Sequence, residues 1–161
     1  MFYYGPGAAL GLVGYLATNG DKGPKDLLKM VMEKENISIT DIVLAETKSQ
    51  IAALDKFELV DSDTKEGLIK LEISIYGFNK KMAFGSNTYP VVKVAMTYQN
   101  DKGDVIWKDS DFVTANASNS DQGFTLDAYL AEPEKIRSGL TRVAQLSVSG
   151  LVKSLQKKIS K

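Results

Sequence analysis

The feature that most constrains this fold is a change in the spacing of apolar residues along the chain. Up to about residue 57 the apolar side chains recur at helical spacing, and in the strands that follow they alternate with polar ones, before helical spacing returns from about Pro133. The clearest alternating run is formed by Ile69, Leu71, Ile73 and Ile75. Strict alternation predicts a strand with one buried and one solvated face. The chain should therefore build a sheet whose apolar face is covered by helices.

A second alternating run follows Pro90 and leads into a predicted hairpin. Its apolar residues are Val92, Val94, Met96 and Tyr98. The turn at residues 100–103 ends in Gly103, which suits a type I turn closed by a left-handed residue, and a strand follows at 105–107. With a short strand at 57–60, we expect an antiparallel sheet of about four strands. Its open, partly solvated face would carry Lys70, Glu72, Ser74, Tyr76, Lys93, Ala95 and Thr97.

Three helices are predicted around this sheet, which gives an α+β fold. The first covers residues 25–34, and its inner side would hold Leu27, Leu28, Met30 and Val31. The second runs from about Thr40 to Leu54, capped by Thr40 or Ser38. The last is a long helix from about Pro133 to Lys158. Its apolar stripe should pack on the sheet through Ile136, Leu140, Val143, Leu151 and Leu155.

The sequence divides into an N-terminal segment, residues 1–23, and a single α+β domain, residues 24–161. The segment is rich in glycine and carries no charge before Asp21. Its apolar run is shorter than the ~20 residues that span a bilayer. Two interpretations stay open for residues 5–18. They are covered by the domain or by a partner, or they drive self-association or lie close to a membrane.

Composition excludes several classes of function. The chain contains no histidine and no cysteine, so no zinc site with those ligands and no triad built on them can form. Its 20 basic and 20 acidic residues balance, and only Arg137 and Arg142 are arginines, which argues against nucleic-acid binding. We therefore predict a protein that is not an enzyme and needs no cofactor and no metal.

The carboxylates do not combine into a recognisable site. Residues 61–67 begin like a calcium loop, but Lys65 stands at a ligand position where the pattern needs an oxygen donor. The aspartates around the hairpin, Asp101, Asp104, Asp109 and Asp111, are expected at a turn and on a solvated strand face. Trp107 is expected to cover the edge of the core, with stacking on a ligand as the alternative. No catalytic, cofactor-binding, metal-binding or partner-binding residue can be assigned.

Several motifs of the second half are similar to those of small bacterial envelope lipoproteins. They are the strand at 89–98, the turn and strand Asn100-Asp101-Lys102-Gly103-Asp104-Val105-Ile106-Trp107, the preceding strand ending in Tyr76-Gly77-Phe78, and Glu132-Pro133-Glu134 before a long helix. The order of elements over residues 38–158 resembles LptE-type assembly lipoproteins and the TolB amino-terminal domain. The lipid-bearing cysteine of such lipoproteins is not in this sequence.

The resemblance implies a periplasmic, non-enzymatic accessory or scaffold domain that binds another envelope component. We expect membrane anchoring only through a lipidated cysteine and signal peptide that would precede this sequence. The alternative function is a small-ligand module that holds a lipid or glycan between sheet and helix. A hydrolase that uses carboxylates alone is a more distant alternative.

Overall fold

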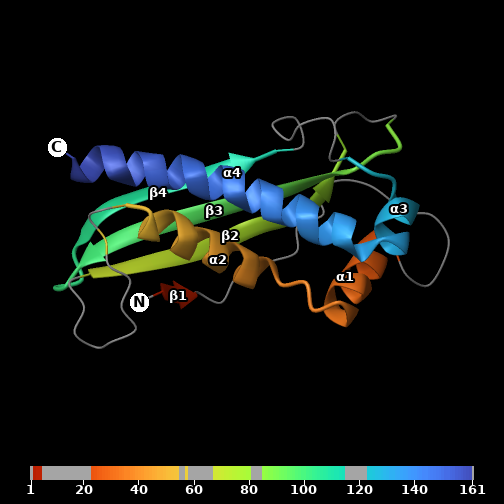
Figure 1. Ribbon diagram of the computed structural model, residues 1–161, viewed down its shortest axis with the longest axis horizontal. Coiled ribbons are helices and arrows are strands. Elements are labelled where there is room, and N and C mark those ends of the chain that lie inside the picture. The colour runs from red at the N-terminus through yellow and green to blue at the C-terminus, as the bar shows by residue number, and fades with distance from the viewer. Residues whose placement is uncertain are drawn as a thin grey trace.

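The computed structural model describes residues 2–4, 23–54, 57, 67–80, 85–114 and 123–160. One sheet forms the first layer, and helices on one of its faces form the second (Figure 1). The strands are β1 (Phe2–Tyr4), β2 (Gly67–Asn79), β3 (Tyr89–Asn100) and β4 (Val105–Val113). The helices are α1 (Pro24–Lys34), α2 (Ile39–Ala52), α3 (Leu126–Ala131) and α4 (Pro133–Ile159). The predicted α+β class is confirmed.

The antiparallel part of the sheet has three strands rather than about four. β2 pairs with β3 and β3 with β4, both antiparallel, while β1 adds to the outer edge of β2 in parallel. A strand was expected at 57–60. At Phe57 this prediction is wrong, because the residue lies outside any strand, and residues 58–60 are outside the described part. β1 falls within the N-terminal segment, and the division at residue 23 stays a prediction.

α1 and α2 are joined by a turn that the local sequence fixes. Asn36 adopts a left-handed conformation with φ of 51°, and the Ile37 N–H donates to the Met32 carbonyl at 2.8 Å. This Schellman arrangement ends α1 and turns the chain into α2. α1 buries Leu28 and Met32, whereas Met30, expected on the inner side, is 46% exposed. Residues 28 and 32 are about one helical turn apart and face the core together. Met30, two positions from each, therefore lies on the opposite side of α1.

α2 begins where the sequence predicts and lies beside α4. The Ser38 hydroxyl accepts from the Asp41 N–H at 3.2 Å, which caps the helix. The buried side chains of α2 are Ile39, Val43, Thr47 and Ile51. Gln50 donates to the Gln145 carbonyl of α4 at 3.3 Å, so a polar contact on the surface supplements the apolar packing between the two helices.

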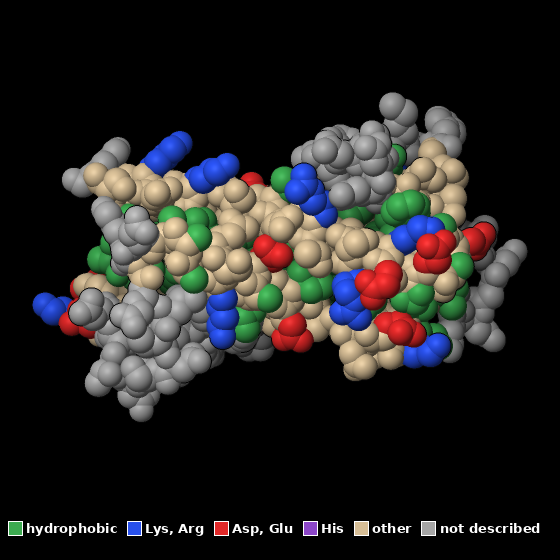
Figure 2. Space-filling view, in the orientation of Figure 1, with side chains coloured by type: hydrophobic (Ala, Val, Ile, Leu, Met, Phe, Trp, Pro, Cys, Tyr) green, Lys and Arg blue, Asp and Glu red, His purple; other side chains and the backbone are tan. Residues whose placement is uncertain are grey.

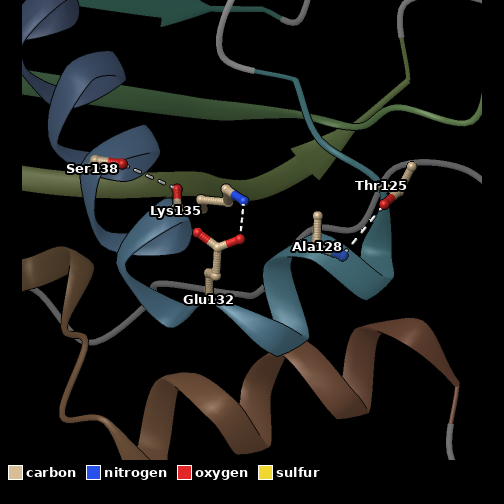
Figure 3. Close-up of polar contacts among 5 residues, drawn as sticks. All are labelled: Thr125, Ala128, Glu132, Lys135 and Ser138. Carbon is tan, nitrogen blue, oxygen red and sulfur yellow. Dashed lines mark hydrogen bonds and ion pairs between the residues drawn. The ribbon is translucent and has the colours of Figure 1, made fainter.

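The short helix α3 was not predicted, because six residues show no helical periodicity. Figure 3 shows how it meets α4. The Thr125 hydroxyl caps α3 by accepting from the Ala128 N–H at 3.3 Å. Glu132 separates the two helices and forms an ion pair with Lys135 of α4, and the Ser138 hydroxyl donates to the Lys135 carbonyl at 3.4 Å. These contacts stabilise the junction between α3 and α4.

α4 supplies the largest share of the helix side of the core. Its predicted stripe is confirmed, since Ile136, Leu140, Val143 and Leu155 are fully buried and Leu151 is 1% exposed. Opposite them the sheet contributes alternate residues of each strand, among them Leu71, Ile73, Val92, Val94 and Met96. No helix of the described residues is long and apolar enough to cross a membrane.

A β-bulge in β2 changes which side chains enter the core. Ile73 pairs with Val94 but Ile75 pairs with Lys93, so Ser74 is an extra residue. Beyond it the alternation is reversed. Tyr76, expected on the open face, therefore lies across from the fully buried Val92 and packs against the core. The sequence shows no sign of the bulge, because the apolar alternation reads through it without interruption.

The predicted hairpin between β3 and β4 is confirmed. Gly103 has φ of 86°, and its N–H donates to the Asn100 carbonyl at 3.1 Å. The Asn100 side chain accepts from the backbone N–H groups of Lys102 at 3.1 Å and Asp104 at 2.8 Å. A side chain that folds back over its own turn in this way favours the loop conformation.

Candidate interaction surface

The face of the sheet that α2 and α4 leave uncovered is a regular grid of side chains, which we call the open face. The strand register and the alternation of side chains place the residues of this face in rows across β2, β3 and β4. The rows are Leu68–Gln99–Val105, Lys70–Thr97–Lys108, Glu72–Ala95–Ser110 and Ile75–Lys93–Phe112. Five of the residues expected on this face are there. Leu68, Gln99, the β4 column and Ile75 were missed, the last because of the bulge at Ser74.

Three exposed apolar side chains lie along the β4 column of the open face. Val105 is 56% exposed, Ile106 39% and Phe112 42%. A second bulge contributes, because Ile106 is an extra residue between the Tyr98–Trp107 and Gln99–Val105 pairs. The only other large apolar side chains exposed in the described part are Met30 and Leu146, on two different helices. Single exposed residues are ordinary. Three on one strand, with Val105 and Ile106 near one end and Phe112 near the other, make β4 a candidate contact strand.

The charges of the open face are mainly positive. Lys70, Lys93 and Lys108 lie there with a single acid, Glu72. In the described ranges no carboxylate lies within 4.0 Å of any of the three lysines. The helix side differs. Lys29 pairs with Glu33 at 3.7 Å and Arg137 with Glu134 at 3.0 Å, and Figure 2 shows blue and red side chains side by side there.

The free edge of β4 is obstructed by its own side chains. Asp109 and Asp111 were expected on the solvated strand face, but they share the phase of the buried Trp107 and Val113 and so lie on the side of α4. The Asp109 carboxylate accepts from the Ser110 N–H at 2.8 Å and from the Ser154 hydroxyl of α4 at 2.6 Å. Inward-pointing charges on an edge strand oppose the addition of another strand.

The other hairpin carboxylates form no site either. Asp104 accepts from the Asn100 side-chain amide at 3.1 Å, and Asp101 lies in the exposed turn. Asp111 lies close to Gly150 of α4, where a β-carbon added to the glycine would be 3.6 Å from the carboxylate. Across the described residues no three acidic side chains gather as metal ligands would. The prediction that the domain needs no metal stays a prediction.

The layer between sheet and helices is filled. Val43 and Ile51 of α2, Leu140 of α4 and Met96 of β3 all have 0% exposed surface. A side chain that lined a cavity of water size or larger would have accessible surface facing that cavity. Trp107 is 8% exposed, which confirms its expected place at the edge of the core and leaves its ring unavailable for stacking on a ligand.

The two tyrosines with a raised pKa, Tyr76 and Tyr129, have structural roles. Tyr129 of α3 is fully buried, donates to the Thr88 carbonyl at 3.1 Å and packs against the Phe78 ring at 4.6 Å between centroids. Burial raises the pKa of Tyr129 far above its ordinary value. Burial also raises the pKa of Tyr76, and the nearby Glu33 carboxylate raises it further. Neither phenol is suited to release a proton near neutral pH.

Two features from the sequence cannot be placed. Residues 61–66 of the calcium-like loop and the glycine-rich residues 5–18 lie outside the described part. The interpretations given to them therefore remain those of the sequence alone.

Similar solved structures come from bacteria. Protein XCC0632 of Xanthomonas campestris, described by the family model DUF330, has a TM-score of 0.48 and 13% identity, covering 76% of this chain and 66% of its own. Lipoprotein GNA1162 of Neisseria meningitidis has a TM-score of 0.28 and 12% identity, covering 68% of each chain. This chain thus spans slightly less than two thirds of the first. No family model and no curated protein matches the sequence.

One of these neighbours is a lipoprotein, which is the broad class that the sequence resembles. The finer likeness to LptE-type lipoproteins and the TolB amino-terminal domain stays a prediction. TM-scores below 0.5 are too low to decide what this chain does, so its function has to be argued from its own residues.

Proposed function

We propose that this chain is a non-enzymatic accessory or scaffold domain of the bacterial cell envelope that binds another envelope protein through the open face. The observation that carries the binding part is the exposure of Val105, Ile106 and Phe112 on one strand of a face that no described helix covers. The resemblance of residues 38–158 to envelope lipoproteins supports the compartment, which we take to be the periplasm.

Two features of the structure favour this function over its alternatives. The Asp109 carboxylate obstructs the β4 edge, so a partner would meet the face rather than add a strand. The fully buried side chains between α2, α4 and the sheet leave no space beside them for a lipid or glycan. The lack of histidine and cysteine supports a role in binding rather than in catalysis.

The proposal can be tested by photo-crosslinking in cells that produce the protein naturally. Phe112 is replaced by p-benzoylphenylalanine, which keeps an aromatic ring within the proposed contact. Leu146 on α4, which is 37% exposed against 42% for Phe112, is replaced in the same way as the matched control. Cell fractionation before mass spectrometry assigns the compartment of each adduct.

We expect a discrete adduct with one envelope protein from position 112 and not from position 146. The result that counts against docking through the open face is no adduct at 112, or the same adducts from both positions. An adduct with a second copy of the chain would assign the face to self-association, and recovery of the protein in the cytosol would reject the compartment.

A further inference from the structure

We infer that the open face is built to receive an acidic protein surface, one that places Asp or Glu side chains around its own apolar contacts. The inference rests on the function proposed above and adds the chemistry of the partner. The starting observation is the excess of three lysines over one glutamate on a face of an otherwise charge-balanced chain. No described carboxylate lies within 4.0 Å of any of these lysines.

The position of Lys93 determines which charge a partner has to bring to the open face. Lys93 is half-buried and lies in one row between Ile75 of β2 and the exposed Phe112 of β4. A partner that covers Phe112 must also remove water from the Lys93 ammonium. Burial of an ammonium without an opposite charge is strongly unfavourable, so a compatible partner has to bring a carboxylate to this row.

The other two lysines of the open face also favour a partner that carries carboxylates. Lys70 and Lys108 stand on either side of Thr97, two rows from Lys93, with the row of Glu72 between. Across the three strands the lysines therefore form a triangle, with one on each of β2, β3 and β4. A partner with carboxylates at matching positions would be oriented on the face as well as attracted to it.

A second copy of this chain does not fit the open face. In a symmetric dimer the same patch meets itself, so the lysine-rich rows of the two copies would approach each other. Like charges brought together across an interface oppose association. This argument concerns the open face alone and leaves the N-terminal residues 5–18 aside.

The size of the face indicates a transient contact. Four rows on three strands cover roughly 20 by 15 Å, or about 300 Å², whereas stable complexes bury about 800 Å² on each partner. Affinity from apolar area alone would be low. Charge attraction should therefore contribute much of the encounter rate, and it should weaken as salt is added.

The test adds charge reversals to the chain that carries p-benzoylphenylalanine at position 112. Lys93→Glu and Lys108→Glu are made singly and together, and Lys25→Glu, an exposed site at the start of α1, is the matched control. Lys93→Gln separates loss of charge from its reversal. Circular dichroism of each purified variant checks that the fold is retained. We expect the adduct yield to fall about tenfold in the double reversal, equivalent to ~1.4 kcal/mol.

The outcomes separate the two proposals. If the parent chain gives no adduct at 112, docking through the open face fails. If the adduct forms but its yield is equal in the double reversal and in Lys25→Glu, docking stands and the acidic partner is rejected. A crosslinked partner peptide whose surroundings are basic would also reject it.

Vesicles test the other anionic surface that the lysines could meet. The purified chain is sedimented with phosphatidylcholine vesicles, with and without about one third phosphatidylglycerol, a fraction chosen to give a strongly negative surface. We expect no binding that depends on Lys108. Binding to the anionic vesicles that Lys108→Glu abolishes and Lys25→Glu does not would assign the face to a membrane and overturn the inference.

Discussion

The polar side chains buried in the described part of this domain have hydrogen-bond partners, with one exception. The Thr47 hydroxyl donates to the Val43 carbonyl at 2.7 Å, and the Tyr129 hydroxyl donates to the Thr88 carbonyl. Among the described residues the buried exception is the Ser147 hydroxyl of α4. A small residue fits this fully buried position on α4, at the cost of one unsatisfied hydroxyl.

The first prediction concerns the core face of α4. Replacing Leu151, 1% exposed, by alanine should lower the free energy of unfolding by ~2–5 kcal/mol, because it removes buried methyl groups and leaves a cavity. The same change at Leu146, 37% exposed, should cost less than about 0.5 kcal/mol. Urea unfolding of both variants measures this. Equal losses would show that the assigned face of α4 is wrong.

A second prediction follows from the buried phenol of Tyr129. Because its pKa is raised in the folded state, the stability it contributes is present below the ordinary tyrosine pKa of about 10 and is lost as the pH rises above it. Tyr129→Phe should cost about 1 kcal/mol near neutral pH through the lost hydrogen bond. Between pH 9 and 11.5 its unfolding free energy should then fall less than that of the unchanged protein. Parallel pH curves would contradict this account.

At the scale of elements, the sequence predicted the strong periodic signals and missed what interrupts them. α2, α4 and the β3–β4 hairpin lie close to their predicted bounds, because apolar spacing and a glycine turn determine them locally. The bulges at Ser74 and Ile106 leave the apolar pattern of the sequence intact. The pattern therefore did not predict that Tyr76 points toward the core. β1 and α3 are too short to show a period of their own.

The edge of β4 gives the third prediction. Asp109→Val removes the acceptor for the Ser110 N–H and for the Ser154 hydroxyl and adds a residue that favours strands. We expect concentration-dependent association, measured by analytical ultracentrifugation. Lys108→Val introduces the same side chain on the same strand but leaves Asp109 in place, so it should remain less associated. Equal association of both variants would mean that added apolar surface, rather than an unblocked edge, is responsible.

At the scale of the whole molecule, one side of the sheet is packed against helices and the other is the face that we propose for contact. The sequence could predict the first, because a buried face needs only apolar residues at the right spacing. It could not identify the open face as a site. Val105 and Phe112 belong to different phases of β4 unless the bulge at Ile106 is known, and the surroundings of Lys93 depend on its neighbours on two other strands.

The fourth prediction concerns metal. Because the chain has no histidine or cysteine and the described carboxylates do not gather, thermal unfolding with and without EDTA should coincide to within about 1 °C. A ligand that binds only the folded state raises the unfolding temperature by mass action, and its removal lowers it. A drop of several degrees in EDTA, reversed by added calcium, would establish a metal site and contradict the prediction.

The contact between α2 and α4 has a consequence for biosynthesis. Gln50 and Gln145 are 95 positions apart, so the ribosome has to complete most of the chain before α2 meets the helix that covers it. At translation rates of about 5–20 residues per second, this interval lasts roughly 5–20 s. Throughout it the apolar side of α2 is accessible to chaperones and to other nascent chains. Release of this protein in a foldable form should therefore depend on what occupies α2 during those seconds.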